Sequence, residues 1–301
     1  MTQRLSFFTS LIMIGALLSG LHFTLQAVAQ NPDAARTGVI LEVDGPIGPA
    51  IAEYFEEQIV EANASGADLV IVEMDTPGGL DTSMRQMIKA ITASDTPVAT
   101  FVTPAGARAA SAGLYIMYAS HIAAMSPGTN TGAATPVQVG GAPPSPEPGS
   151  NPFEAEEPAA GDGETPADDE ASEDPTADGE AAAETEETAT EETPALGNED
   201  ALRAKVINDA AAYIRSLADL RGRNADWGER AVRDAASLAA NEALELNVID
   251  VVATDIPDLL AQIDGRTIDI NGEAVVLETE DMQLTRVEPD LLTRILAFIS
   301  N

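Results

Sequence analysis

The sequence contains no cysteine, and its 301 residues include only two histidines, His22 and His121, and two lysines, Lys89 and Lys205. Without cysteine the chain has no disulfide, no thiol nucleophile and no thiolate metal ligand. A zinc site made of histidine or cysteine ligands is nearly excluded, and no EF-hand-like spacing of carboxylates offers calcium a site. We therefore expect neither a metal nor a cofactor, and few side chains remain as a catalytic base.

Basic residues are also scarce, since 15 Lys and Arg face 50 Asp and Glu, for a net charge of −35. Nucleic-acid binding requires a basic face, so a nucleic-acid partner is not expected. Residues 141–200 hold 20 of the acidic residues and nine of the 19 prolines, but no lysine or arginine. Such a segment repels itself and offers little to bury, so we predict a disordered acidic insert at residues 140–199. A solvated tether is the simplest role for it, and calcium binding or docking is the alternative.

The N-terminus has the pattern of a targeting segment. Arg4 precedes a largely apolar run at residues 5–18, and Ala27-Val28-Ala29 forms an A-x-A site. We predict a secretory signal at residues 1–29, cleaved before Gln30. An uncleaved anchor that spans a bilayer with residues 5–28 is the alternative. Either reading exports the rest of the chain, to the periplasm or the extracytoplasmic face of a membrane.

The rest of the sequence alternates between two kinds of hydrophobic pattern. Continuous apolar runs predict strands at 37–43, 67–74, 97–103 and 122–125, and helical spacing predicts helices at 51–64, 81–91 (capped by Asp81) and 112–119. Beyond the insert we expect helix at 201–220 and 230–246, a strand at 248–252, and a hairpin at 267–277 that turns at Asn271-Gly272. Strands that alternate with helices predict an α/β domain with a mainly parallel sheet and crossover helices. That domain consists of residues 37–139 and 200–301.

Two glycine-containing turns follow neighbouring strands of this sheet. Gly78-Gly79 ends the second strand and opens a helix, and the third strand leads through Gly106 to Ser111 at the next helix start. Free N–H groups at a helix start stabilise an oxyanion, and ligands of parallel sheets bind at the carboxyl ends of the strands. A simple N-cap is the alternative for Ser111. The pairing of the two turns favours an active site with a serine nucleophile.

A serine nucleophile needs a base. His121 follows Ser111 by ten residues, which puts it at the far end of a helix of roughly 12 Å, so we interpret it as structural. Lys89 ends an exposed-looking helix face. Lys205 lies between Leu202 and Val206, which we expect to be buried, so desolvation would favour its neutral amine. A surface lysine is the alternative.

Several motifs resemble one family. They are MDTPGGL at 74–80, GARAASAG at 106–113, SHIAAMSPGT at 120–129, AYIRSLA at 212–218, GRN at 222–224, and NEAL at 241–244 followed by VID at 248–250. In this order they closely resemble the NfeD-family membrane-associated serine proteases, over most of residues 37–295 outside the insert. The resemblance implies a ClpP-like fold, related to the crotonase superfamily and to signal peptide peptidase A.

The resemblance also implies roles for particular residues. The family's catalytic serine falls on Ser111, its general-base lysine on Lys205, and its oxyanion donors on the backbone N–H groups of Gly79 and Ala112. Asp234 falls near a family acid that orients the lysine. Residues 132–134, where ClpP carries its histidine, are small, which fits a Ser-Lys dyad. The long acidic insert between the two dyad residues is a departure from the family pattern, although closing a longer loop costs only about 0.6 kcal/mol per doubling of its length.

By resemblance, the expected activity is endopeptidase cleavage of hydrophobic segments, near the C-terminus of a stomatin-like membrane partner, by a homo-oligomer that is at least a dimer. A non-catalytic envelope scaffold that binds the same partner is the main alternative. A crotonase-type acyl-thioester enzyme is disfavoured by export, because coenzyme A thioesters are mainly intracellular.

Overall fold

The computed structural model describes residues 35–137 and 198–299. The expected signal at 1–29 and nearly all of the expected insert at 140–199 lie outside the described residues. Contacts divide the chain into one unit of residues 1–136 and 205–301 and another of residues 137–204, and the fold below is that of the first unit. No helix within the described ranges is long and apolar enough to cross a membrane.

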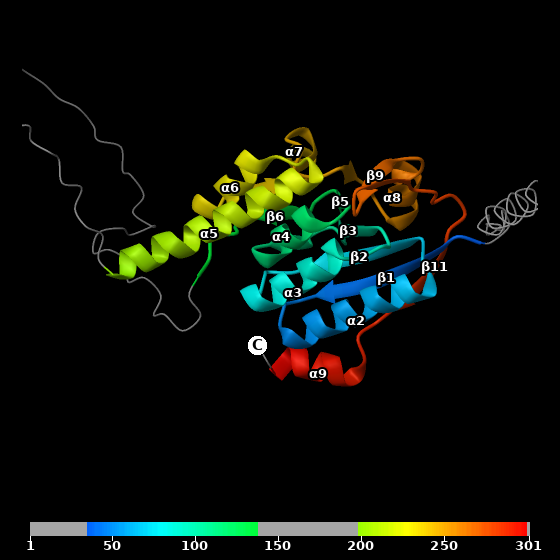
Figure 1. The fold of residues 1–301 in the computed structure, drawn as a ribbon, viewed down its shortest axis with the longest axis horizontal. Helices are drawn as coiled ribbons and strands as arrows, with labels where there is room; N and C mark the ends of the chain where they lie inside the picture. Colours follow the sequence, from blue (N-terminus) through cyan, green and yellow to red (C-terminus); the bar gives the residue numbers. More distant parts are fainter. Residues whose placement is uncertain (1–34, 138–197, 300–301) are drawn as a thin grey trace, which may run out of the picture. The chain divides into compact units, whose positions relative to one another are not determined.

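The centre of the fold is a six-stranded sheet in which every neighbouring pair of strands is parallel. Its order is β11 (Gln283–Val287), β1 (Thr37–Asp44), β2 (Leu69–Asp75), β3 (Val98–Val102), β5 (Ile122–Met125) and β8 (Val251–Val252). All five residues of β3 are buried, as expected for a central strand covered on both faces. The predicted α/β fold with a mainly parallel sheet is thus confirmed (Figure 1).

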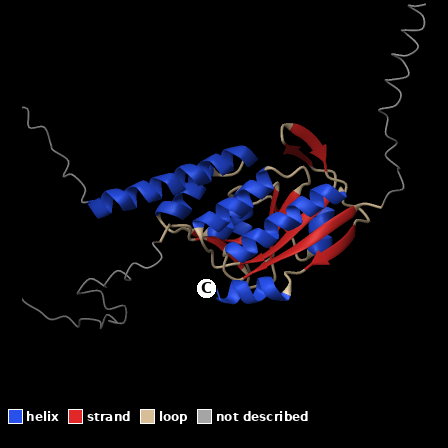
Figure 2. Ribbon diagram, turned by 60° about the horizontal axis from the view of Figure 1, so that its bottom comes forward, coloured by secondary structure: helices blue, strands red, loops and turns tan. Residues whose placement is uncertain are grey.

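Helices cover the two faces of this sheet, and each face has its own core. On one face the sheet packs with α2 (Pro49–Ser65), α3 (Asp81–Thr92), α4 (Ala112–Ala119), α5 (Asn198–Arg221), α6 (Ala225–Arg233) and α7 (Ala240–Glu245). The smaller core of the opposite face contains Phe101 together with residues of α8 (Ile256–Ile263) and of the segments that follow it. Figure 2 shows the helices lying along the strands. The sheet is therefore sandwiched between two apolar layers, and its strand ends remain available for a site.

Two smaller β units accompany the main sheet. The hairpin predicted at 267–277 is present as β9 (Thr267–Ile270) and β10 (Glu273–Val276), and Asn271 and Gly272 turn it with φ of 54° and 88°. The other unit is a sheet of three-residue strands, β4 (Arg108–Ala110), β6 (Asn130–Gly132) and β7 (Ser237–Ala239). The apolar patterns did not reveal this second sheet because its strands are too short for a period to show.

The structure corrects two expectations about helices. The helix expected at 230–246 is instead the end of α6, strand β7 and α7, because Ala235 adopts a positive φ of 52° that no helix continues. Asp81 does not cap α3, since the N-cap residue is Leu80 and the Asp81 carboxylate instead accepts hydrogen bonds from Arg85 one turn later.

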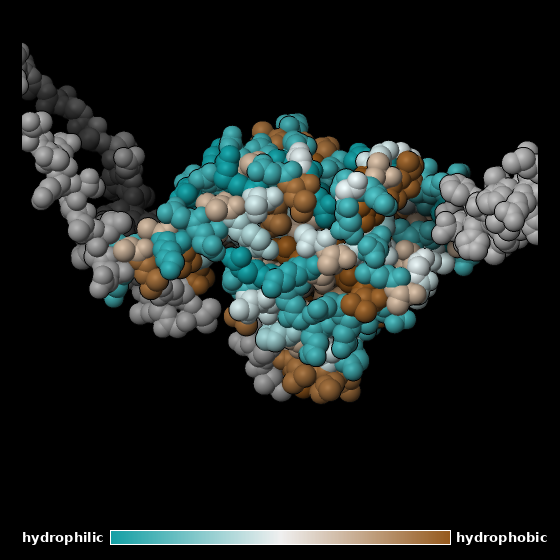
Figure 3. All heavy atoms as spheres, viewed as in Figure 1, coloured by the Kyte–Doolittle hydropathy of each residue, from teal (hydrophilic) through white to brown (hydrophobic). Residues whose placement is uncertain are grey.

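The last helix, α9 (Leu291–Ile299), docks on the domain. It packs against α2, and Ala297 contacts the main core. Its other face leaves Leu291, Leu292 and Ile295 exposed at 75%, 62% and 45%. These side chains contribute to the brown surface over α9 at the lower edge of Figure 3.

Candidate active site

Ser111 lies on a sharp turn between β4 and α4. It occupies the N-cap position of α4 with φ 51° and ψ −115°, a conformation that non-glycine residues rarely adopt. Its hydroxyl does not cap the helix and makes no hydrogen bond with any described residue. The backbone is instead held by hydrogen bonds from the Ser111 N–H to the Gly132 carbonyl (2.9 Å) and from the Leu114 N–H to the Ser111 carbonyl (3.0 Å). Ser111 is thus the N-cap residue by position, but its side chain does not cap the helix. A half-buried, unpaired hydroxyl stands on a strained turn, which is typical of functional sites.

The glycine turn after β2 lies directly against Ser111. A Cβ added to Gly78 would come within 2.6 Å of the Ser111 Cβ and 3.0 Å of its Oγ. β2 and β4 are held together here, since the Thr76 N–H donates to the Arg108 carbonyl at 2.7 Å and the Ala110 N–H to the Thr76 carbonyl at 3.1 Å. The two turns that the sequence paired are thus adjacent in space.

Several backbone N–H groups at these turns remain without an acceptor among the described residues. The N–H of Gly78 is occupied, because it donates to Oγ1 of Thr76 at 3.1 Å. The next one, on Gly79, has no acceptor there, and neither has that of Ala112, the first residue of α4. These are the two donors that the family resemblance implies for an oxyanion hole. Free donors at a helix start stabilise negative charge.

Gly78→Ala tests the close contact between the two turns. Gly78 and Gly106 both have positive φ, 115° and 93°, but a Cβ on Gly106 would meet nothing within 4 Å. Alanine is strained at both positions, and only at Gly78 does it also collide with Ser111. We expect Gly78→Ala to lower the free energy of unfolding by about 2 kcal/mol more than Gly106→Ala, measured by urea denaturation. Equal losses would show that Gly78 does not contact Ser111.

Lys205 lies in the N-terminal half of α5 with an exposed side chain, and it forms no hydrogen bond or ion pair with the residues that the structure describes. The expectation that its neighbours Leu202 and Val206 are buried is wrong, since they are 52% and 39% exposed. The buried stripe of α5 is formed by alanines as much as by large residues: Ala210, Ala211, Ile214, Leu217 and Ala218. Ile207 extends this stripe toward the start of α5. Lys205 is two positions away from Ile207, which is about 200° around the helix, so Lys205 faces outward.

A cluster of side chains fixes α5 against α3 and α4. Arg85 of α3 pairs with Asp209 at 2.8 Å, and its guanidinium lies 4.3 Å from the centre of the Tyr213 ring. Tyr213 stacks on Tyr115 of α4 with ring centroids 5.9 Å apart, and the Tyr115 hydroxyl donates to the Ala210 carbonyl at 3.3 Å. We refer to Arg85, Tyr115, Asp209 and Tyr213 as the tyrosine clamp.

The clamp fixes α5 against α4 a few residues after Ser111 and after Lys205. Near the other ends of the two helices, Nε of Arg221 donates to the Ala119 carbonyl at 2.8 Å, so α4 and α5 run in the same direction. Ser111 precedes Tyr115 by four residues, and Lys205 precedes Ala210 and Tyr213, the α5 residues that contact Tyr115, by five and eight. The outward face of Lys205 keeps its amine from a direct bond to the Ser111 hydroxyl in this structure.

The other candidate residues are placed as follows. Asp234 ends α6 with an exposed side chain and forms no side-chain bond to Lys205 in the described part of the chain. Lys89 is exposed on α3, as expected.

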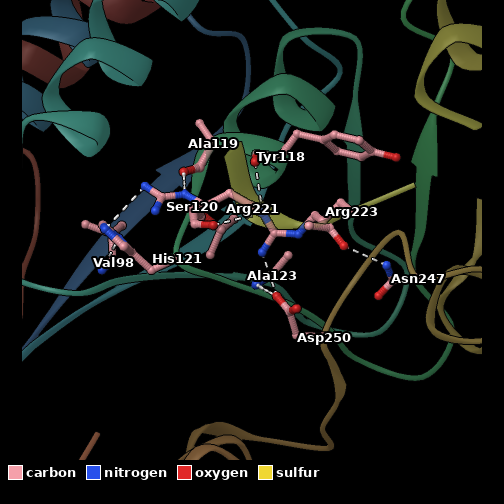
Figure 4. A network of polar contacts seen from close by, with 12 residues as sticks. Val98, Tyr118, Ala119, Ser120, His121, Ala123, Arg221, Arg223, Asn247 and Asp250 are labelled. Carbon is pink, nitrogen blue, oxygen red and sulfur yellow. Dashed lines mark hydrogen bonds and ion pairs between the residues drawn. The ribbon is translucent and has the colours of Figure 1, made fainter. Parts of the chain in front are cut away.

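His121 is 8% exposed and belongs to a polar network with Arg221, Arg223 and Asp250 (Figure 4). It follows the C-terminal end of α4, whereas Ser111 precedes the N-terminal end. Its Nδ1 accepts the Val98 N–H at 3.1 Å. Burial, together with the nearby Arg221 and Arg223, lowers the pKa of His121 to about 3, so it is neutral at physiological pH. Its interpretation as a structural residue agrees with these contacts.

Comparison with known proteins finds relatives of the NfeD type. Residues 37–166 match the model of the NfeD1b N-terminal domain. Over 264 residues, 87% of this chain, the sequence is 29% identical to the membrane-bound protease PH1510 of Pyrococcus horikoshii, covering 48% of that protein. Over 121 residues it is 36% identical to the membrane protein NfeD1b of Bacillus subtilis, covering 27% of it and 40% of this chain.

Solved structures agree with these sequence matches. The 1510-N membrane protease of P. horikoshii, specific for a stomatin homologue, matches with a TM-score of 0.62 and 27% identity, over 89% of this chain and all of that one. A lysine-to-alanine mutant of that membrane-bound stomatin-specific protease, in complex with a substrate peptide, matches with a TM-score of 0.66 and 28% identity, over 89% of this chain and 99% of that one. A serine-to-alanine mutant matches with a TM-score of 0.62.

The fold is thus that of the 1510-N membrane-bound protease. The resemblance to the NfeD family is confirmed, since residues 37–166 match the model of the NfeD1b N-terminal domain. The chain spans about half or less of the length of the curated relatives that it matches.

Proposed function

We propose that this chain is a serine endopeptidase in which Ser111 is the nucleophile and Lys205 the general base. The observation that carries the proposal is the position of Ser111, whose unpaired hydroxyl stands on a strained turn against Gly78. The relatives support it, because they are named proteases, and among their solved structures are a serine mutant and a lysine mutant.

The chemistry would proceed through an acyl-enzyme. The Lys205 amine takes the proton of Ser111 as Oγ attacks the peptide carbonyl, and the N–H groups of Gly79 and Ala112 bind the oxyanion that forms. The same proton then passes to the leaving amine, and water hydrolyses the ester. Asp234 is our candidate for orienting the lysine, on the strength of the family pattern.

The dyad would have to close by a movement at the start of α5. No residue of α5 before Ala210 is buried among those whose side chains are described, so few contacts hold these turns in place. Segments with few buried contacts rearrange at low free-energy cost. We infer that rotation or unwinding of these turns, with the tyrosine clamp as the fixed point, brings Lys205 to Ser111 when a peptide binds.

For the substrate we propose hydrophobic segments near the C-terminus of a stomatin-like membrane protein. The support is the relative that is named a stomatin-specific protease and its mutant solved with a substrate peptide. We further propose that the chain acts on the extracytoplasmic side of a membrane, as a homo-oligomer of at least two copies, with residues 1–29 as its signal or anchor and residues 140–199 as an insert in the protease domain.

A non-catalytic scaffold is the second candidate, and the outward face of Lys205 favours it. Incubation of the full chain with a peptide from the C-terminus of a stomatin-like protein distinguishes a protease from a scaffold. We expect mass spectrometry to detect two fragments from wild type and none from Ser111→Ala. A scaffold would bind the peptide and leave it intact.

A further inference from the structure

A cavity of about 320 Å³ lies at the end of α4 opposite to Ser111, near β5, β8 and β9. Its polar lining consists mainly of charged or ionisable side chains: His121, Arg221, Asp250, Arg266 and Asp269. Because the eight residues of α4 separate it from Ser111, this cavity is distinct from the proposed active site.

Two hydrogen-bond donors lie against the His121 imidazole, which offers only one acceptor nitrogen. A neutral imidazole has one acceptor nitrogen, and Nδ1 must be that nitrogen because the fixed backbone N–H of Val98 donates to it at 3.1 Å. Nε2 therefore carries the hydrogen. Yet Nε2 lies 3.3 Å from Nη2 of Arg221, and a guanidinium is also only a donor. Nε2 of His121 and Nη2 of Arg221 are thus two donors that face each other, and the His121 side chain is only 8% exposed. Both donors need an acceptor from a third group.

The cavity also has an excess of positive charge. Asp250 is paired with the buried Arg223 at 2.6 Å and accepts the Ala123 N–H, so its charge is compensated. The positive charges of Arg221 and Arg266 are opposed by one remaining carboxylate of the lining, that of Asp269. Its Oδ1 already accepts a hydrogen bond from the Gly272 N–H. Arg221 and Arg266 donate to main-chain carbonyls, of Ala119, Asp269 and Asp250, which bring no negative charge. The cavity lining therefore carries one net positive charge, although the net charge of the whole chain is −35.

We propose that this cavity binds a carboxylate. One carboxylate oxygen accepts hydrogen bonds from Nε2 of His121 and Nη2 of Arg221, and the other pairs with the exposed guanidinium of Arg266. A singly charged anion balances the lining, whereas a doubly charged one would be repelled by Asp250 and Asp269. A free small carboxylate and the C-terminal carboxylate of a peptide offer the same two oxygens.

Nitrogen NMR of the imidazole tests the site. His22→Gln leaves His121 as the single histidine of the full chain. Its spectrum should show the neutral form with the proton on Nε2, and acetate titrated at constant sodium chloride concentration should shift the Nε2–H signal until it saturates. A tripeptide with a free C-terminus and the same peptide amidated separate the two sources. Saturation by acetate alone indicates a small carboxylate, and saturation by the free-acid peptide but not its amide indicates a chain terminus.

Arg266→Gln in the same background should weaken carboxylate binding about tenfold, as expected when one charge-assisted hydrogen bond of about 1.4 kcal/mol is lost. Arg230→Gln is the matched control, because Arg230 is an exposed arginine of α6 that does not line the cavity, and it should leave the dissociation constant unchanged. The proposal is overturned if the proton resides on Nδ1, if neither acetate nor the free-acid peptide gives a saturable shift, or if both arginine variants bind alike.

Discussion

Ser111→Ala should lower the rate of peptide cleavage by on the order of 10⁴-fold or more, the usual consequence of removing a catalytic nucleophile. The fold should be unaffected, because the Ser111 hydroxyl makes no hydrogen bond with the described residues and its loss leaves nothing unpaired there. We expect the free energy of unfolding to change by no more than about 0.5 kcal/mol. The measurements are kcat/KM on a hydrophobic fluorogenic peptide and urea denaturation of the same preparations.

Ser65→Ala is the matched control for this prediction. Ser65 is an exposed serine at the end of α2, and its hydroxyl bonds only to carbonyls of its own helix. Its replacement should leave kcat/KM unchanged. Retention of most of the activity in Ser111→Ala would exclude Ser111 as the nucleophile. Loss of activity together with unfolding would assign it a structural role instead.

Lys205→Ala should lower the cleavage rate by on the order of 10³-fold, the typical contribution of a general base. Lys205→Arg should be equally impaired, because a guanidinium does not give up its proton in proteins and cannot serve as a base. Neither variant should lose stability, since Lys205 is exposed and makes no bond to a described residue. The measurement is kcat/KM at several pH values, with urea denaturation alongside.

The chain provides an unusually clean control for this prediction, because Lys89 is its only other lysine. Lys89 is exposed on α3, and Lys89→Ala removes the same charge. If Lys205 acts only through the net charge of the protein, the two variants behave alike. If it is the base, Lys89→Ala keeps full activity and Lys205→Ala does not.

Much of the fold could be predicted from the sequence because the sheet is parallel and buried. The strands β1, β3 and β5 are continuous apolar runs, and α4 begins and ends where its apolar residues and the flanking serines indicate. The Asn271-Gly272 hairpin was also predictable, since both residues adopt the positive φ that this pair favours. Strands β4 and β6 escaped prediction because each has only three residues and pairs through tertiary contacts.

For the candidate site, the sequence predicted the surroundings of Ser111 better than those of Lys205. The adjacency of Ser111 and Gly78 followed from two turns at the ends of neighbouring strands, and the structure brings them into contact. The environment of Lys205 did not follow, because the hydrophobic pattern places large apolar residues on the buried face of α5. The buried face of α5 in the structure contains Ala210, Ala211 and Ala218. A search for large apolar residues misses such a face, because alanine packs closely but contributes little apolar area.

The connection between Lys205 and Ser111 is the central claim, and a substrate-independent reaction tests it most directly. A fluorophosphonate modifies a serine only when a base activates its hydroxyl, so the rate of Ser111 modification reports on the base. The rate should be followed by mass spectrometry in wild type, Lys205→Ala and Lys89→Ala. We expect modification of Ser111 in wild type and Lys89→Ala, and a rate on the order of 10³-fold lower in Lys205→Ala. Equal rates in the two lysine variants, or no Ser111 adduct in wild type, would contradict the account.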